Sequence, residues 1–182
     1  MVSMSKTLVV NIFGAPGAAK STTAAGTFSK LKLAGVNAEL VTEYAKDIVW
    51  EGSTAKLENQ LYVFGKQYQR LFRLEGKVDV TVTDSPILLS TIYDNTEGPE
   101  LKNLVLKTHK NMDTLNFFLN RVKKYNPAGR MQTAEESDAL SLKIKGMLEE
   151  NNISFTELDG NEEAMNIITQ LTISELSRRM IY

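Results

Sequence analysis

The chain has 182 residues, 42% of them hydrophobic, and a formal charge of −1. This length predicts one globular domain with a full core over residues 1–182, and the near-neutral charge gives no overall sign of a protein that coats nucleic acid. With no cysteine and one histidine, His109, the sequence excludes disulfides, thiol nucleophiles, cysteine-bound zinc and a histidine metal cluster.

Strand-like and helical segments alternate along the chain, which predicts an α/β fold with a parallel sheet and helices on both faces. The expected strands are rich in Val, Ile, Leu or Phe and cover residues 7–13, 36–42, 78–83, 114–119 and 153–158. The expected helices cover residues 20–33, 54–74, 100–111, 133–151 and 162–180, with Ser53 or Thr54 and Asp159 or Asn161 as caps. Ligands of such sheets collect at the carboxyl ends of the strands, so functional side chains are expected there.

The segment GAPGAAKST follows the first expected strand and opens a helix. It matches the pattern GxxxxGK(S/T) at every fixed position except one, and in this pattern backbone N–H groups curl around the phosphates of a nucleotide such as ATP. Lys20 would face the outer phosphates and Ser21 would offer a hydroxyl ligand to Mg²⁺. A turn that binds nothing would explain the glycines but not Lys20, Ser21 and Thr22 in order. The predicted nucleotide-binding residues are Gly14, Ala15, Pro16, Gly17, Ala18, Ala19, Lys20, Ser21 and Thr22.

Ala19 departs from this pattern, because glycine is usual before the lysine. If the position needs a positive φ, the methyl group costs about 1–2 kcal/mol. If φ is helical, alanine costs nothing. We expect tolerance at a modest cost.

Two carboxylates follow expected strands. Glu43 lies after the second strand and Asp84 after the third, so both should lie near the phosphate loop. There they would hold Mg²⁺ or take a proton from an attacking hydroxyl, and we assign a metal-binding role to Asp84. The alternative for Glu43 is a helix cap or a surface charge. Tyr44 would stack on a substrate ring, or simply pack at a helix start.

The long expected helix over residues 54–74 carries Gln60, Gln67 and Arg70 near one stripe. These side chains would line an acceptor pocket, with amides for a base and a guanidinium for an anion. An ordinary solvated face is the alternative. Its apolar residues are expected in the core: Leu57, Leu61, Phe64, Leu71 and Phe72.

A basic segment with Pro127 and Gly129 at its centre follows the fourth strand, over residues 120–133. We interpret it as a lid whose Arg121 and Arg130 would stabilise charge during phosphoryl transfer. A solvated basic loop is the alternative.

The combination of GAPGAAKSTTAAG, LVTEYAKDIVWEG, NQLYVFGKQYQR and TDSPILL resembles a family of small, mostly phage-encoded P-loop proteins regarded as ATPases or kinases. It is similar, more distantly, to ribosylnicotinamide kinase domains and to the thymidylate and deoxynucleoside kinase group. This resemblance implies a three-layer P-loop kinase fold with strand order 2-3-1-4-5, a lid arginine, ATP and Mg²⁺. By position, Glu43 resembles the base of deoxynucleoside kinases. Ser85 and Pro86 stand where those kinases commonly have an arginine, which weakens any more specific assignment.

These features predict an ATP- and Mg²⁺-dependent kinase of a small nucleoside- or nucleotide-like acceptor. One alternative is a kinase of hydroxymethylpyrimidine in DNA or of another polynucleotide hydroxyl, although the charge of −1 argues mildly against strong nucleic-acid binding. Another is a nucleotide-dependent ATPase switch. No apolar run reaches the ~20 residues of a membrane span and no leader pattern opens the chain, so we expect a cytoplasmic protein without a membrane partner, in the host cytoplasm if phage-encoded. The oligomeric state stays open.

Overall fold

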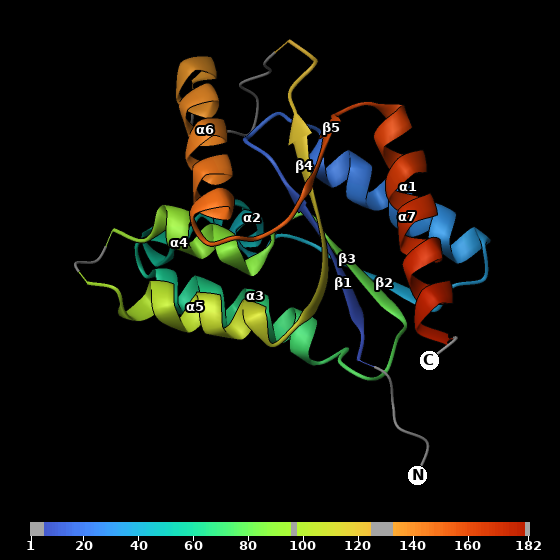
Figure 1. The fold of residues 1–182 in the computed structure, drawn as a ribbon. Helices are drawn as coiled ribbons and strands as arrows, with labels where there is room; N and C mark the ends of the chain where they lie inside the picture. Colours follow the sequence, from blue (N-terminus) through green and yellow to red (C-terminus); the bar gives the residue numbers. More distant parts are fainter. Residues whose placement is uncertain (1–5, 96–97, 125–132, 181–182) are drawn as a thin grey trace.

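The computed structural model describes residues 6–95, 98–124 and 133–180. A five-stranded parallel sheet runs through its centre in the order β2-β3-β1-β4-β5, which confirms the predicted fold (Figure 1). The strands are β1 (Leu8–Phe13), β2 (Ala38–Val41), β3 (Val80–Thr83), β4 (Asp113–Asn120) and β5 (Thr156–Asp159). All the pairings are parallel, so the carboxyl ends lie at one edge of the sheet.

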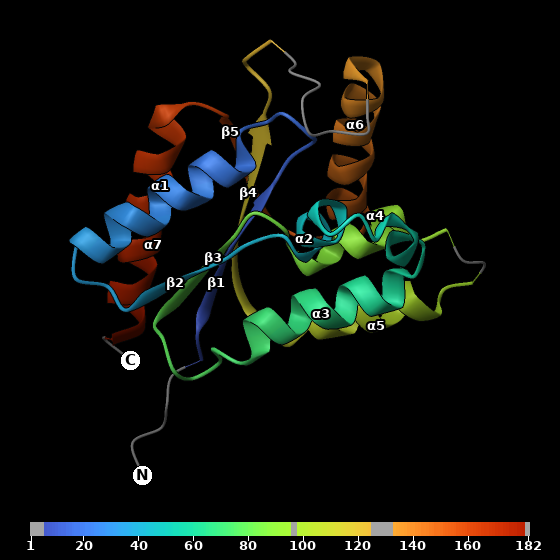
Figure 2. The same ribbon diagram turned by 180° about the vertical axis from the view of Figure 1, so that it is seen from behind.

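Helices cover both faces of the sheet, so the central strand β1 is buried along its whole length. Helices α1 and α7 lie on one face, and the other helices lie on the opposite face (Figures 1 and 2). The α-helices are α1 (Lys20–Leu33), α2 (Tyr44–Trp50), α3 (Gln60–Phe72), α4 (Ser90–Tyr93), α5 (Glu100–Lys110), α6 (Ala134–Glu150) and α7 (Glu162–Met180), and the 3₁₀ turns are η1 (Thr54–Glu58) and η2 (Ile87–Leu89).

The side chains of β1 alternate between two cores. Val9 and Phe13 pack with α3 to α6, whereas Leu8 and Val10 pack with α1 and α7. This period of two follows from the pleat of a strand. Burial on both faces explains why the strand is a nearly continuous apolar run, as is typical of parallel sheets.

The predicted single helix over residues 54–74 is wrong. A 3₁₀ turn ends at Glu58, and α3 starts after Asn59, whose side-chain oxygen accepts a hydrogen bond from the Tyr62 N–H at 3.0 Å. The cap is therefore Asn59, since Ser53 makes no capping bond with its side chain. Leu61 and Phe72, expected in the core, are 59% and 57% exposed.

Other predicted boundaries need smaller changes. Helices α1 and α7 have the predicted bounds, whereas β2 and β3 each begin two residues later than expected and β5 begins three residues later. The sequence reading missed α2 and α4. Of the second pair of proposed caps, Asn161 is confirmed, because its side-chain oxygen accepts from the Ala164 N–H at 3.2 Å.

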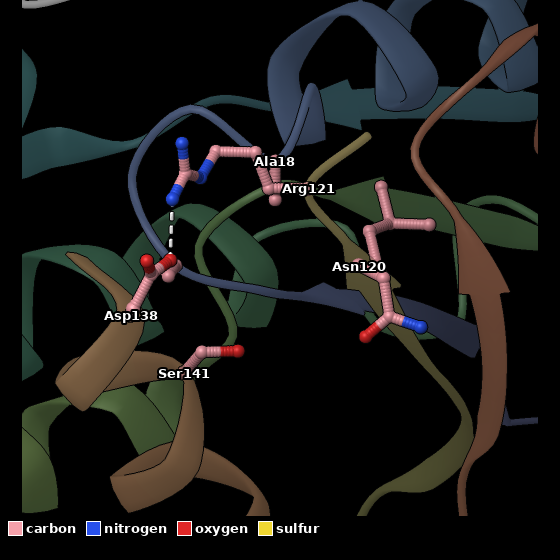
Figure 3. A pocket seen from close by; sticks show the side chains of 7 residues that line it. Ala18, Asn120, Arg121, Asp138 and Ser141 are labelled. Atoms are coloured by element: carbon pink, nitrogen blue, oxygen red, sulfur yellow. Dashed lines mark hydrogen bonds and ion pairs between the residues drawn. The ribbon is translucent and has the colours of Figure 1, made fainter. Parts of the chain in front are cut away.

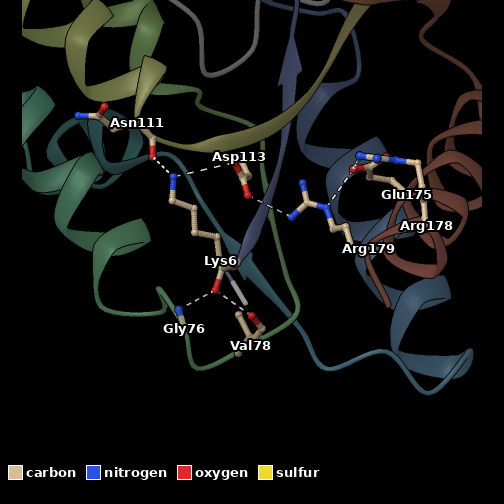
Figure 4. A network of polar contacts seen from close by, with 9 residues as sticks. Lys6, Gly76, Val78, Asn111, Asp113, Glu175, Arg178 and Arg179 are labelled. Atoms are coloured by element: carbon tan, nitrogen blue, oxygen red, sulfur yellow. Dashed lines mark hydrogen bonds and ion pairs between the residues drawn. The ribbon is translucent and has the colours of Figure 1, made fainter. Parts of the chain in front are cut away.

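At the amino ends of the strands a polar network joins α7 to the sheet (Figure 4). Arg179 lies 3.4 Å from Asp113 and 3.0 Å from Glu175, and the Lys6 ammonium donates to the Asn111 carbonyl at 2.9 Å. Hydrogen bonds from Arg178 above all lower the pKa of Glu175 to about 2. This network lies at the edge opposite the carboxyl ends and holds the last helix in place.

Candidate functional site

The predicted phosphate loop connects β1 to α1 and turns back on itself. The Ala18 N–H donates to the Ala15 carbonyl at 3.1 Å, and the Thr23 N–H donates to the Ala19 carbonyl at 2.9 Å as the helix opens. Gly14 has φ +146°, and a Cβ there would lie 2.9 Å from the Leu119 carbonyl oxygen. Only glycine fits this position, because both the backbone conformation and the space exclude a side chain.

Ala19 has φ +64° and ψ +20°, the left-handed conformation. The sequence left open whether φ at this position is positive or helical. It is positive, so the alanine is strained, at a cost of about 1–2 kcal/mol. The loop therefore has the backbone path that glycine usually provides, but with an alanine methyl group on it.

Lys20, Ser21 and Thr22 form the first turn of α1. The Lys20 ammonium donates to the Ala15 carbonyl at 3.2 Å, so this side chain folds back over the loop. Ser21 and Thr22 are exposed, and the first turn carries no acidic residue. A cation above a loop of N–H groups at a helix N-terminus is a suitable environment for a phosphate group.

Glu43 and Asp84 both lie at the carboxyl edge of the sheet, where the sequence reading placed them. Glu43 is half-buried and occupies the N-cap position of α2, as the helix-cap alternative expected, but its side chain makes no capping hydrogen bond. Burial raises the pKa of Glu43 above its ordinary value of 4.5; the charge of Lys20 opposes this rise, and the charge of Asp84 adds to it. Lys20 and Asp84 are thus both close enough to Glu43 for their charges to act on it.

Asp84 directly follows β3 and is only 5% exposed. Its Oδ1 atom is buried and accepts no hydrogen bond within the described part of the chain. A buried carboxylate oxygen of this kind suits a cation, and the exposed hydroxyl of Ser21 is a second oxygen donor on the loop. No cluster of three or more His, Asp or Glu side chains that would hold a metal was found among the described residues. The buried Oδ1 of Asp84 and the hydroxyl of Ser21 are oxygen ligands of the kind that Mg²⁺ takes when it binds together with nucleotide phosphates.

Gln60 and Gln67 are buried, with exposed fractions of 7% and 3%. The solvated-face alternative is therefore wrong for both. Gln67 accepts from the Tyr44 N–H at 2.8 Å and donates to the Thr42 carbonyl at 3.3 Å, whereas Gln60 donates to the Leu57 carbonyl at 2.6 Å. Gln67 thus braces the backbone on both sides of Glu43, whereas Gln60 braces the preceding 3₁₀ turn, and contact of either amide with an acceptor stays a prediction.

Arg70 and Tyr44 belong to one polar and aromatic group. The Arg70 guanidinium forms an ion pair with Asp47, donates to the Thr42 carbonyl at 3.1 Å and lies 5.0 Å from the centre of the Tyr44 ring. The Tyr44 and Tyr62 hydroxyls are 2.7 Å apart. Arg70 is therefore engaged within the protein, while its predicted contact with a substrate anion stays untested.

Tyr93, at the end of α4, is a residue near Glu43 that the sequence analysis did not single out. Tyr93 is 36% exposed, but burial around its hydroxyl raises the pKa of Tyr93 to about 12, and the charge of Glu43 adds to the rise. Tyr93 therefore lies near Glu43 in space although the two are far apart in the chain. No pattern in the sequence marks it, because α4 is one short turn after η2.

Arg121 follows β4 directly and forms an ion pair with Asp138 of α6 (Figure 3). Arg130 and most of the predicted lid lie outside the described residues, and Lys123 and Lys124 are exposed. A cavity of about 200 Å³ separates this pair from the phosphate loop. Its lining residues are Ala15, Ala18, Leu119, Asn120, Arg121, Asp138 and Ser141.

A second cavity, of about 320 Å³, lies on the α1 and α7 side of the loop. It is lined by Ala19, Thr22, Thr23, Lys123, Gly160, Asn161, Glu162 and Met165. Gly160 is close to the loop: a Cβ on it would lie 2.5 Å from the Ala18 carbonyl oxygen. The sequence reading missed this role, for which a glycine just after the last strand is the only signal.

The sheet order and the loop define the chain as a P-loop protein with the fold of nucleoside and nucleotide kinases. A family model described as "AAA domain" matches residues 9–164, and the chain belongs to that family. A comparison with curated proteins finds no match. Within the described residues, no helix has the length and hydropathy of a membrane span.

Solved structures of deoxyadenosine kinase from M. mycoides are similar to this chain. The structure with bound dATP has a TM-score of 0.56, and the structure with dCMP and a flexible dCDP has a TM-score of 0.52. Each is 15% identical over 93% of this chain and 99% of that chain. APS kinase from Mycobacterium tuberculosis matches over 80% of this chain and 99% of that chain at 18% identity, with a TM-score of 0.37. At these identities the likeness to deoxyadenosine kinase shows the fold alone.

Proposed function

We propose that this protein is an ATP- and Mg²⁺-dependent phosphotransferase that moves the γ-phosphoryl group of ATP to a hydroxyl of a nucleoside- or nucleotide-like acceptor. The observation that carries the proposal is the meeting of Lys20, Glu43 and Asp84 at the phosphate loop. A cation for phosphate, a desolvated carboxylate and a buried carboxylate with an unused oxygen are the groups that phosphoryl transfer needs. The similarity in fold to deoxyadenosine kinase supports the same class of reaction.

Each group has a role in this proposal. The loop N–H groups and Lys20 bind the phosphates, and Ser21 and Asp84 would hold Mg²⁺, which when bound neutralises charge on the phosphates. Glu43 orients the acceptor hydroxyl and takes its proton, a task that suits a carboxylate whose pKa is raised by burial. Arg121, with Arg130 from the segment outside the described residues, stabilises the charge that develops during transfer.

The two sides of the loop suit the two substrates. The cavity of about 320 Å³ begins at Ala19 and Thr22, so it offers room for the base of ATP beside the bound phosphates. Glu43 lies outside the lining of this cavity, at the carboxyl edge of the sheet, and in this proposal it faces the acceptor together with the neighbouring Tyr44. We place Gln60, Gln67 and Arg70 behind these residues, as the support of the acceptor side.

The test is transfer of label from γ-³²P-ATP to nucleosides, nucleoside monophosphates and nicotinamide riboside, with Mg²⁺-ATP binding measured in parallel by calorimetry. We expect Lys20→Ala to abolish binding and Glu43→Gln to keep binding but lose transfer. Lys32→Ala is the matched control, because Lys32 is an exposed lysine in the last turn of the same helix. Unchanged binding in Lys20→Ala would overturn the proposal. Slow hydrolysis of ATP with every acceptor unlabelled would favour the nucleotide-dependent switch.

One observation favours a polymeric acceptor as a second candidate. Trp50 is 77% exposed at the end of α2, the helix that Glu43 precedes, and Lys46 of the same helix is also exposed. Exposed aromatic and basic side chains together are typical of surfaces that bind single-stranded nucleic acid. In this candidate, the acceptor is a hydroxymethylpyrimidine or another hydroxyl in DNA.

Labelling of a DNA oligonucleotide that contains hydroxymethylpyrimidine, beside the free nucleoside, separates the two candidates. For a polymeric acceptor, Trp50→Ala lowers transfer to the oligonucleotide more than transfer to the nucleoside, and binding weakens with salt. Leu33→Ala is the control, because Leu33 is a similarly exposed apolar residue at the end of α1. No retardation of the oligonucleotide in a gel at low salt would remove this candidate.

A further inference from the structure

The ion pair between Arg121 and Asp138 lies beside the phosphate loop. The Arg121 side chain is 19% exposed and Asp138 is 67% exposed, so the guanidinium is inside the site and the carboxylate reaches it from the rim. Figure 3 shows the guanidinium turned toward Asp138, with Ser141 further along the same helix as another residue that lines the cavity. Arg121 also lines the cavity that Ala15 and Ala18 of the loop border.

The position of Asp138 relative to the loop is set by its own helix. Ser137, the residue before it, is fully buried and donates to the Pro16 carbonyl of the phosphate loop at 2.8 Å. The start of α6 is held by a capping box, in which Glu136 N–H donates to Thr133 Oγ1 at 3.2 Å and Thr133 N–H donates to the Glu136 carboxylate at 2.7 Å. The carboxylate of Asp138 is thus carried by a fixed turn of helix anchored on the loop.

A triphosphate in the loop would bring several negative charges to the edge of this cavity. Guanidinium groups bind phosphate through strong, charge-assisted hydrogen bonds. An ion pair between a guanidinium and an exposed carboxylate is much weaker, because water screens the two charges. Arg121 would therefore exchange its carboxylate partner for a phosphate when the nucleotide binds.

We propose that Asp138 is a positioning residue that competes with the nucleotide phosphates for Arg121. It holds the guanidinium at the loop in the absence of nucleotide. Because the ion pair between Arg121 and Asp138 must break before Arg121 binds phosphate, a stronger ion pair gives a lower affinity for the triphosphate. This inference rests on the proposed function, since it needs a triphosphate in the loop. It predicts that removal of the Asp138 charge tightens nucleotide binding.

The experiment measures binding of Mg²⁺ with a nonhydrolysable ATP analogue by calorimetry in the whole chain. For Asp138→Asn we expect about two- to five-fold tighter binding at low salt, the range that an exposed ion pair supplies, and a smaller gain at high salt. Glu135→Gln is the matched control, because it removes the same charge from the first turn of the same helix. In an Arg121→Gln background, Asp138→Asn should change nothing. Asp138→Ser repeats the test if Asp138→Asn does not fold.

The outcomes separate this inference from the proposed function. A gain in Asp138→Asn that is absent in Glu135→Gln and lost without Arg121 supports the exchange. Equal gains in both single variants, a gain that persists without Arg121, or unchanged or weaker binding in Asp138→Asn overturn it while the proposed function stands. A wild-type protein that does not bind the analogue overturns both.

Discussion

The side-chain amide of Gln67 bonds the backbone on both sides of Glu43: it accepts from the Tyr44 N–H at 2.8 Å and donates to the Thr42 carbonyl at 3.3 Å. Gln67 is 3% exposed and belongs to α3, 23 residues further along the chain than Tyr44. One buried amide thus holds the turn from which the candidate catalytic carboxylate projects.

This relationship predicts a combined loss in Gln67→Met. The substitution keeps the length of the side chain but leaves the Tyr44 N–H without its partner, which costs about 1–3 kcal/mol, whereas the Thr42 carbonyl keeps its hydrogen bond from Arg70. We expect lower stability in urea denaturation and a lower kcat for phosphoryl transfer with little change in the KM for ATP. Gln69→Met is the control on an exposed position of the same helix, and an equal loss there would contradict the prediction.

Ala19→Gly should stabilise the protein. The left-handed conformation costs alanine about 1–2 kcal/mol, and glycine removes this strain from the folded state. Glycine also has more conformational freedom in the unfolded state, which lowers the gain by about 0.5–1 kcal/mol. We expect a net gain of about 1 kcal/mol or less in urea denaturation, with nucleotide binding retained. Ala25→Gly, at an exposed position inside α1, should instead lose about 1 kcal/mol. Similar losses in the two variants would show that Ala19 is not strained.

Gly160→Ala should loosen the phosphate loop. A Cβ at Gly160 would lie 2.5 Å from the Ala18 carbonyl oxygen and 3.0 Å from the Asn120 carbonyl oxygen, and neither backbone atom can move freely. We expect a loss of about 1–3 kcal/mol in stability and weaker binding of the ATP analogue.

Gly146→Ala is the comparison for this prediction. Gly146 lies inside α6, a Cβ there would meet no atom within 4 Å, and alanine favours the helix. We expect a smaller change in stability and nucleotide binding close to that of wild type. If Gly160→Ala bound the analogue as well as Gly146→Ala does, the close packing of Gly160 on the loop would have no functional importance.

Glu43→Gln should raise stability at neutral pH while it abolishes transfer. Burial above all raises the pKa of Glu43 in the folded state, so between the unfolded value of 4.5 and the raised value the folded chain binds more protons than the unfolded chain. The contribution of this carboxyl to stability is therefore present below pH 4.5 and is lost as the pH rises through the folded pKa. Melting temperatures of the variant and wild type should lie close together at pH 4 and separate at pH 7, with the variant higher. A variant less stable at pH 7 would contradict this sign.

Much of the fold was predictable from the sequence because its signals are local. The apolar run before Gly14 and the Lys-Ser-Thr triplet after it are consecutive in the chain, so a strand, a loop and a helix start were readable there. Asp84 was identified for the same reason, since it directly follows a buried strand. The strand order agrees with the one that the family resemblance implied.

The errors in the long helix predicted over residues 54–74 have one cause. The polar residue Asn59 ends one turn and caps the next helix, although the apolar period continues through it, and Leu61 and Phe72 carry a core pattern on an exposed face. The hydrophobic period of a sequence describes one helix at a time. It cannot show which face of that helix is left exposed when the neighbouring elements pack against it.

By itself, the sequence determined the phosphate loop and the alternation of strands and helices, because backbone conformation and hydrophobic period depend on residues close together in the chain. Only the tertiary structure decided that Gln67 braces the turn at Glu43, that Tyr93 lies near Glu43, and that Asp138 pairs with Arg121. Each of these contacts joins separate elements, and their partners are chosen by how the helices pack on the sheet, which no local pattern encodes.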